Sequence, residues 1–428
     1  MADRGPARPK QASAAPAATK RQERPSLRVV DASQRRPHRD RAERNRRSLI
    51  LLMVPVSALT VIGLVMVLSA GSISAVEGYG TSFWYFERQS IYAVVGVIGL
   101  AVAARLRYSI WKKLALPLLL GVIPLLLLTF HSSAGSSLYG ASRWIDLGPV
   151  TLQPSEFAKV ALIVFTAAVL SVKGKKIRSP RELAIPLAPA VLAVAGIVIM
   201  QRDLGTTMIL CGTVFLMLFA AGVSGKHLSV IGAGGALATA ALIFGESYRR
   251  SRFLDSFIHP WTDPKGAGYQ LVQGLIALGS GGWFGVGLGA SRARWNYLPN
   301  AHSDFIFAII GEELGLLGAL SVLTLFAVLL YAGIRIAVRA PDSFGRLLAV
   351  GITSWIALQT IVNLGAVTGL LPITGVPLPF VSFGGTALVV ALTGVGILAS
   401  IGRVGVAPGK GKPPASRERS STRIKAGA

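Results

Sequence analysis

The chain has 428 residues, of which 52% are hydrophobic and 15% are charged. This composition excludes a soluble globular protein, because apolar side chains far outnumber those that a soluble core needs. The formal net charge of +25 does not indicate nucleic-acid binding, because the charge gathers at the two ends and no aromatic and basic module accompanies it.

The two ends are polar and basic. Residues 1–47 hold 14 Lys/Arg against 5 Asp/Glu, and residues 403–428 hold 7 against 1. Both segments lack apolar periodicity, so they cannot bury enough surface to offset their chain entropy. We predict two disordered cytoplasmic tails that meet anionic lipid headgroups or a cytoplasmic partner.

Ten apolar runs lie between the tails. A bilayer core about 30 Å thick needs roughly 20 apolar helical residues. The runs fall near 48–70, 90–104, 114–130, 155–172, 184–200, 203–222, 228–244, 304–332, 346–370 and 383–402. The sequence therefore predicts an all-α polytopic membrane domain over 48–402 with about ten transmembrane helices. The second and fifth runs are short, so totals of eight or nine spans are the alternatives.

Basic residues in the short connections predict the orientation of the chain. Every second connection carries Lys or Arg, namely those near 105–113, 173–181, 226 and 335–346. The connection 371–382, which is expected on the other side of the membrane, contains no charged residue. With ten spans, both termini are expected in the cytoplasm.

The longest connection, 245–303, is expected on the outer side between the seventh and eighth spans. It contains six basic residues. Long segments escape the charge rule, but an anionic substrate at the outer face would explain why the charges are there. A weakly apolar stretch from Tyr269 to Ala290 predicts a re-entrant or surface-lying helix.

The strongest candidate for chemistry is the run YLPNAHSDFIFAIIGEELG at 297–315. His302 and Asp304 open a helix here, and Glu312 and Glu313 follow two turns later. Asp304 lies where the basic external segment meets an apolar helix, and partial desolvation there would make its carboxylate a better general base. The alternative interpretation is that Asp304 only caps the helix.

A second constellation is the run ASRWIDLGPVTLQPSEFAK at 141–159. Pro154 suits the first turn of a helix, which places Glu156 and Lys159 at i, i+3 on one face of a span. They form either a neutralising structural pair or part of a substrate site. Arg143 is drawn to the membrane interface by the apolar residues after it, where a guanidinium can bind phosphate through two hydrogen bonds.

Polar residues also border or enter other spans, at 87–89, 201–203, 359 and 363. Capping and hydrogen bonds between helices explain these positions as well as substrate contact does. The sequence leaves both interpretations open.

Four segments carry a family resemblance. They are the two runs above, PKGAGYQLVQGLIALGSGGWFGVGLGAS at 264–291 and LGAVTGLLPITGVPLPFVSFGGT at 364–386. In this order, and over roughly 48–402, they resemble the signature blocks of the SEDS family (shape, elongation, division and sporulation) of peptidoglycan glycosyltransferases.

Three shorter blocks make the chain more similar to the division branch of that family than to its elongation branch. They are FWYFERQ at 83–89, GYQLVQ at 268–273, and GLGAS at 287–291 followed by YLP at 297–299. Two positions depart from the pattern. Asn300 stands where the division branch usually has Glu, and Thr374 where several relatives have Lys, so any role of those side chains is in doubt.

The resemblance implies the SEDS fold and an inverting enzyme that polymerises lipid II into glycan strands at the outer face of the bacterial cytoplasmic membrane. Asp304 matches the family's catalytic aspartate. The pyrophosphate leaving group needs positive charge, and Mg²⁺ or Mn²⁺ is a candidate to share that role, while no organic cofactor is implied. The candidate substrate-binding residues are Arg143, Lys159, Glu156, Arg88 and His302.

The resemblance also implies partners. These are lipid II, glycan linked to undecaprenyl pyrophosphate, a class B penicillin-binding protein transpeptidase and other membrane proteins of the division septum. Rival hypotheses are a lipid II flippase, a polymerase of cell elongation and a non-catalytic scaffold. Flipping needs a path through the membrane, whereas the charged motifs gather at the outer ends of the spans.

Overall fold

The structure is a computed structural model that describes residues 1–2, 32–131, 135–138, 141–146, 148, 150–173, 180–245, 250 and 253–404. Most of the predicted N-terminal tail and nearly all of the predicted C-terminal tail lie outside the described residues. The chain divides into two units, Met1–Ala42 and Glu43–Ala428, and the membrane-spanning segments lie in the second.

Ten helices in the described parts of the chain are long and apolar enough to cross a membrane. Each overlaps one predicted run, so the prediction of ten spans is confirmed, including the short second and fifth. They are α1 (Ala32–Tyr79), α2 (Trp84–Arg105), α3 (Ser109–Leu128), α4 (Pro154–Lys173), α5 (Pro180–Met200), α6 (Leu204–Ala221), α7 (Gly225–Phe244), α10 (Ile306–Val338), α11 (Ser343–Val367) and α12 (Gly385–Val404).

Several helices start earlier than predicted, α1 and α2 by the most. α1 begins at Ala32 rather than at 48, because residues 32–47 are rich in Arg, which favours helices although it is too polar for lipid. The membrane-spanning part of α1 starts at Arg46. α2 begins at Trp84 rather than at 90, and its polar Gln89 is buried in the protein.

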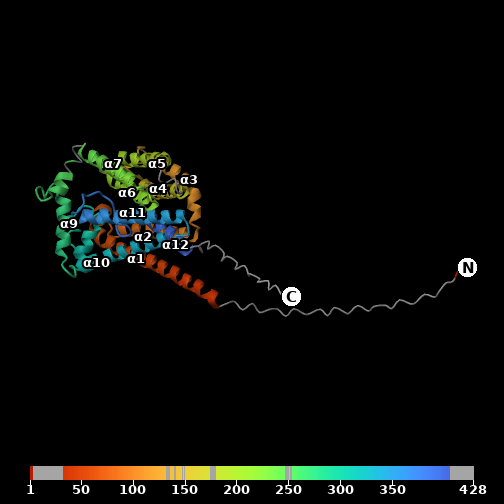
Figure 1. Ribbon diagram of the computed structural model, residues 1–428. Helices are drawn as coiled ribbons and strands as arrows, with labels where there is room; N and C mark the ends of the chain where they lie inside the picture. Colours follow the sequence, from red (N-terminus) through yellow and green to blue (C-terminus); the bar gives the residue numbers. More distant parts are fainter. Residues whose placement is uncertain are drawn as a thin grey trace, which may run out of the picture. The chain divides into compact units, whose positions relative to one another are not determined.

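α11 lies at the centre of the helix bundle. It packs against α4, α6 and α10, and Figure 1 shows α4, α6 and α11 as neighbours. Its Trp355 is 1% exposed. α7 lies at the edge of the bundle, where it packs on α6 and buries only Leu228 of its own residues. The polar side chains of a site are therefore expected around α11.

α2 and α12 pack closely because glycines line their contact. A Cβ built at Gly96 would lie 2.6 Å from Leu392, and one at Gly396 would lie 2.4 Å from the carbonyl oxygen of Leu100. In lipid, where the hydrophobic effect does not drive helices together, such close approach of backbones supplies the packing. This contact fixes the start of α2 beside the start of α12.

A small three-stranded antiparallel sheet lies between α3 and α4, which the all-α prediction did not include. Its strands are β1 (Gly135–Leu138), β2 (Ala141–Asp146) and β3 (Thr151–Leu152), in the order β1-β2-β3. The hydroxyl of Tyr92 on α2 donates to the Thr151 carbonyl at 3.0 Å and accepts from the Thr151 amide at 3.1 Å. The sheet is thereby attached to the start of α2.

The external segment contains a short π-helical turn (Leu254–Ile258) and α9 (Tyr269–Ser280). The helix predicted from Tyr269 to Ala290 is confirmed only for its first half, because Gly282, Gly285 and Gly287 have positive φ angles and form a turn instead. We call residues 281–289 the glycine-rich turn.

The glycine-rich turn docks onto a break in α10. Gly315 has φ 68° and ψ −167°, which is not helical. The amides of Val286 and Gly287 donate to the carbonyls of Glu312 and Glu313 at 3.0 and 3.1 Å, and further bonds run from α10 back to the turn. Backbone that leaves the helical pattern inside a membrane needs such protein partners.

The predicted orientation can be tested with single cysteines. Cys211 is exposed, so a Cys211→Ser background is required. Lys226→Cys, at the start of α7, should react with a membrane-impermeant maleimide only after the membrane is opened, whereas Trp261→Cys, in the external segment, should react on intact cells. Both side chains are exposed, so access depends on the side of the membrane. Reaction of both positions on intact cells would contradict ten spans with cytoplasmic ends.

Candidate functional site

The connection between α11 and α12, residues 371–384, lies inside the bundle. Val376, Leu378 and Phe380 are buried, and a Cβ built at Gly63 of α1 would lie 2.5 Å from the Phe380 carbonyl oxygen. Without repeating structure, this connection pairs few of its own backbone groups, and unpaired groups are costly inside a membrane.

Three buried amide side chains supply the missing partners. Asn363 donates to the Val376 carbonyl at 2.8 Å, and Gln359, one turn earlier on α11, donates to the Pro377 carbonyl at 3.0 Å. Gln89 of α2 donates to the Ser382 carbonyl at 3.1 Å and accepts from an amide of the same connection. The sequence left Gln89, Gln359 and Asn363 open between hydrogen bonding and substrate contact, and the structure gives all three hydrogen-bonding roles.

Asp304 lies against this connection, just before α10. Its carbonyl oxygen accepts from Asn363 at 2.8 Å, and a Cβ built at Gly375 would lie 3.6 Å from its carboxylate. The N-cap position of α10 is Phe305, with no side-chain cap hydrogen bond. The N-cap residue of α10 is thus Phe305 and not Asp304, and the half-buried carboxylate of Asp304 lies beside Gly375.

His302 is held between aromatic rings. Its ring centroid lies 4.2 Å from that of Tyr85 and 5.7 Å from that of Phe383, and its carbonyl accepts from the Phe383 amide at 3.0 Å. Burial lowers the pKa of His302 from 6.5 to about 4, because the apolar surroundings disfavour the charged ring. His302 is therefore neutral near pH 7.

Glu156 and Lys159 form a buried ion pair at the start of α4. The Lys159 ammonium lies 2.8 Å from both carboxylate oxygens of Glu156 and donates to Gln359 at 2.9 Å. It also lies 5.2 Å from the ring centroid of Trp355, and each charged side chain is only 2% exposed. This is the geometry of the neutralising pair, the first of the two interpretations that the sequence left open.

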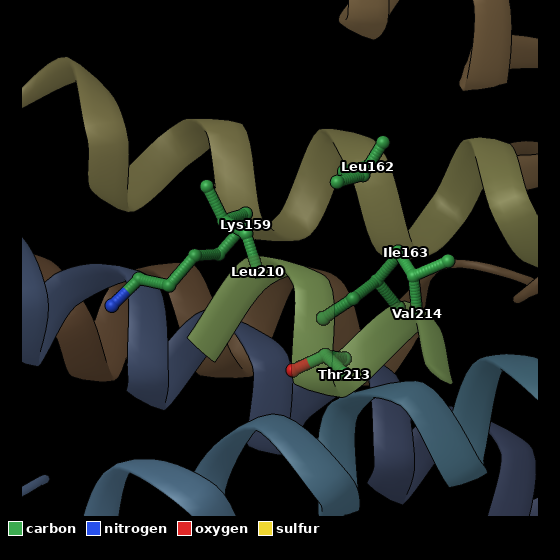
Figure 2. A pocket seen from close by; sticks show the side chains of 6 residues that line it. All are labelled: Lys159, Leu162, Ile163, Leu210, Thr213 and Val214. Atoms are coloured by element: carbon green, nitrogen blue, oxygen red, sulfur yellow. The ribbon is translucent and has the colours of Figure 1, made fainter. Parts of the chain in front are cut away.

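Figure 2 shows the surroundings of the Lys159 stem, with Leu162 and Ile163 on the same helix and Thr213 on α6. The crevice between these side chains has no room for a water molecule, and the Thr213 hydroxyl donates to the carbonyl of Ile209 at 2.7 Å. The crevice is packing space and not a ligand site.

Gln359 and Asn363 join the ion pair to Asp304. They are four residues apart, so they lie on one face of α11, about 6 Å from each other along its axis. Gln359 contacts Lys159 and the connection 371–384, while Asn363 contacts the same connection and the backbone of Asp304. The structure thereby brings the two separate sequence candidates into one network.

Arg143 lies at the same end of the bundle, on β2. Its guanidinium donates to the carbonyls of Gln201 and Arg202 and lies 3.9 Å from Asp203. Asp203 in turn caps α6 by accepting from Thr206 at 3.1 Å. The side chain of Arg143 keeps 26% exposure, so one of its edges remains open to a ligand.

Arg88 is the other candidate cation, on the first turns of α2. Its guanidinium lies 4.2 Å over the ring of Trp84. The neighbouring Tyr85 and Gln89 contact His302 and the connection 371–384. Arg88 therefore lies close to the Asp304 site, half-buried, with its charge held by a cation–π contact.

Glu312 and Glu313 have structural partners. Glu312 accepts from the Ser291 hydroxyl at 2.5 Å and the Arg292 amide at 2.9 Å, and Glu313 accepts from Ser69 of α1 at 2.7 Å. Both carboxylates are buried. They hold the external segment and α1 against the break in α10.

Sequence reasoning gave no role to Gly375 or Ser382. The hydroxyl of Ser382 accepts from the Leu378 amide at 2.8 Å and donates to the Ser303 carbonyl at 2.7 Å. Gly375 has a φ angle of 72°. Residues 371–382 contain several Pro, a Gly and no charged side chain. This composition is unusual for a connection exposed to water, and it could have indicated that the segment is buried.

The fold and the site define a ten-span membrane protein whose buried polar network, with an aspartate at its edge, lies at one end of the bundle. A family model for FtsW, RodA and SpoVE, described as "Cell cycle protein", matches residues 49–405. The chain belongs to this family, which is the SEDS family suggested by its motifs.

Relatives with curated descriptions cover nearly the whole domain. The chain is 41% identical to the "Probable peptidoglycan glycosyltransferase FtsW" of Geobacter sp. (strain M18), over 82% of this chain and 96% of that protein. It is 42% identical to the "Stage V sporulation protein E" of Bacillus subtilis (strain 168), over 83% of this chain and 96% of that one.

Two solved structures share the fold. One, described as "Structural coordination of polymerization and crosslinking by a peptidoglycan synthase complex", matches with a TM-score of 0.69 at 29% identity and covers 82% of this chain and 97% of its own. The rod shape determining protein RodA of Thermus thermophilus matches with a TM-score of 0.62 at 28% identity and covers 82% and 95%.

Proposed function

We propose that this chain is a peptidoglycan glycosyltransferase that polymerises lipid II into glycan strands at the outer face of the cytoplasmic membrane during cell division. The description of the FtsW relatives and the family membership support the activity. The single observation that carries the chemistry is the carboxylate of Asp304. It lies beside Gly375 at the edge of the buried network and is not the helix cap.

The reaction joins two lipid-linked sugars. The 4-hydroxyl of GlcNAc on an incoming lipid II attacks the anomeric carbon of the growing strand, and the bond from that carbon to undecaprenyl pyrophosphate breaks with inversion from α to β. Asp304 accepts the hydroxyl proton as the new bond forms. A positioned general base contributes typically 10²–10⁴-fold in rate.

The pyrophosphate leaves with negative charge, which positive side chains stabilise. Arg143 and Arg88 are two half-buried cations at this end of the bundle, and a guanidinium binds phosphate oxygens through two hydrogen bonds. Lys159 is bound to Glu156 and Gln359, so its proposed role is to hold Gln359 and the connection 371–384. His302 offers a neutral ring at the same place.

A divalent cation is also proposed to help neutralise the pyrophosphate leaving group. The described residues contain no group of three or more His, Cys, Asp or Glu side chains placed to hold a metal ion. Mg²⁺ that arrives on a pyrophosphate needs only one or two protein carboxylates, and Asp304 is one at this site. No step above depends on a metal ion.

A class B penicillin-binding protein is the proposed partner, and its transpeptidase would crosslink the new strands. The similarity to a structure described as a peptidoglycan synthase complex supports this. Lipid II, glycan on undecaprenyl pyrophosphate and other septal membrane proteins are the further proposed partners. The proposed location is the division septum, with both termini in the cytoplasm.

The proposed function is tested by mixing the purified full-length chain, its cognate transpeptidase and lipid II, and by separating the products by size. We expect glycan strands of many disaccharides. Movement of labelled lipid II across vesicles without any polymer would contradict the proposal and favour a flippase.

Gly375→Ala should lower polymerisation strongly. The φ angle of 72° costs an alanine roughly 1–2 kcal/mol, and the new methyl group would lie 3.6 Å from the Asp304 carboxylate. Gly222→Ala is the matched control, since Gly222 has a φ angle of 87° with nothing within 4 Å of its Cβ position. The two variants should lose similar stability in thermal unfolding. Equal loss of polymerisation in both would show that backbone strain, and not the methyl group beside the Asp304 carboxylate, is responsible.

A further inference from the structure

A row of aromatic rings lies between the end of α1 and the start of α2, beside the candidate site. The rings of Tyr79 and Trp84 are stacked, with centroids 3.7 Å apart and an interplanar angle of 3°. Tyr85 meets Trp84 edge to face at 4.8 Å and lies 4.2 Å from His302. We call Tyr79, Trp84 and Tyr85 the aromatic ladder. It connects His302, two residues before Asp304, to the exposed end of α1.

The outermost ring of the ladder has one open face. Tyr79 is 52% exposed, and Trp84 covers one face of its ring. Tyr85 lies nearer to Trp84 than to Tyr79, with centroid distances of 4.8 and 6.1 Å. It therefore cannot lie over the other face of Tyr79, which stays accessible to a ligand.

Polar side chains border the ladder. Trp84, Glu87 and Arg88 lie at i, i+3 and i+4, so they share one face of α2. The Arg88 guanidinium lies 4.2 Å from the ring centroid of Trp84, and Glu87 is exposed. Aromatic rings flanked by a carboxylate and a guanidinium suit a sugar, because its C–H groups can pack on a ring face while its hydroxyls bind the polar groups.

The ladder projects beyond the apolar core of the bilayer. From Ser48 to Tyr79 α1 rises about 46 Å, whereas the core is about 30 Å thick. Even a tilt of about 40° leaves the end of α1 outside the core. Apart from Tyr79, residues 77–81 are glycine or polar, and all of them are exposed. The open face of Tyr79 is therefore more accessible to a ligand in water than to lipid tails.

We infer that the aromatic ladder binds sugar units of the glycan strand, an inference that rests on the proposed function. The strand is a β-1,4-linked chain of N-acetylated hexosamines, and each pyranose ring has an apolar C–H face. Tyr79 stacks on such a face while the reducing end of the strand lies at Asp304. This second contact keeps the effective concentration of the strand end high at the site, so the strand stays on the protein between successive additions.

Saturation-transfer NMR tests the inference without turnover. The probe is a lipid-free strand of four alternating GlcNAc and MurNAc units, titrated into the full-length protein in detergent. Saturation of the aromatic protons of the protein should reach the C–H protons of the sugars. Tyr79→Ala should weaken strand binding about tenfold, the effect of one lost aromatic contact. Tyr79→Phe should keep the binding, because the ring face remains.

Tyr331→Ala is the matched control. Tyr331 is 57% exposed and lies near the opposite end of α10 from Asp304, so this variant should bind the strand as the wild type does. Trp84→Ala removes the ring on which Tyr79 is stacked. It should repeat the loss, and it provides the second measurement if Tyr79→Ala fails to fold.

Wild-type affinity for the strand in both ladder variants, or an equal loss in Tyr331→Ala, would overturn the inference. So would a loss of transpeptidase copurification in Tyr79→Ala with unchanged strand binding, which would assign the ladder to the partner protein. The proposed function fails separately. A protein that binds strands through the ladder and makes no polymer would contradict that function alone.

Discussion

Asp304→Asn should reduce polymerisation of lipid II by a factor of at least about 10², the lower end of what a general base contributes. The amide has the size of the carboxylate but cannot accept the hydroxyl proton. The contact that positions this residue, from Asn363 to the Asp304 carbonyl, belongs to the backbone and survives the substitution. Glycan length from purified protein measures the loss, and copurification of the transpeptidase shows that the fold is kept.

Asp263→Asn is the matched control for this substitution. Asp263 is an exposed carboxylate of the external segment that accepts from the amides of Gly266 and Ala267 at 3.0 Å. Its loss should weaken one turn and leave polymerisation close to that of the wild type. Substantial polymerisation by a folded Asp304→Asn protein would remove Asp304 from the proposed mechanism.

Lys159→Met should destabilise the protein by about 3–5 kcal/mol, the usual cost of leaving one member of a buried ion pair without its partner. Glu156 is 2% exposed, so its charge has no access to water once the ammonium is removed. The double variant Glu156→Gln, Lys159→Met should recover most of the loss, because it removes both charges together. Thermal unfolding in detergent measures the stability of the single and the double variant. The control is Lys226→Met, at an exposed position, whose free energy of unfolding should stay within about 0.5 kcal/mol of the wild type.

The activity of the double variant separates the two interpretations of Lys159. If Lys159 only neutralises Glu156, polymerisation should recover together with stability. Recovered stability with lost polymerisation would instead mean that the ammonium itself is required, through its bond to Gln359 or through the pyrophosphate.

The number of spans and the region of the site follow from the sequence, because both depend on local properties. The thickness of the bilayer fixes the length of an apolar helix, so ten runs could be recognised one by one, and the described part of the chain has ten such helices. Asp304 stands out for a similar reason, since a carboxylate at the start of a long apolar helix is costly and therefore informative.

The state of each charged side chain was decided by contacts between segments far apart in the chain. Lys159 is neutralised within α4 by Glu156, but its bond to Gln359 spans 200 residues, and Asn363 reaches the Asp304 backbone across 59. The break at Gly315 likewise exists because the glycine-rich turn supplies backbone partners for it. Hydropathy treats 371–382 as an external connection. The amides of Gln89, Gln359 and Asn363, together with the hydroxyl of Ser382, allow it to lie inside the bundle. An irregular backbone is tolerated in a membrane only where other parts of the protein satisfy its hydrogen bonds.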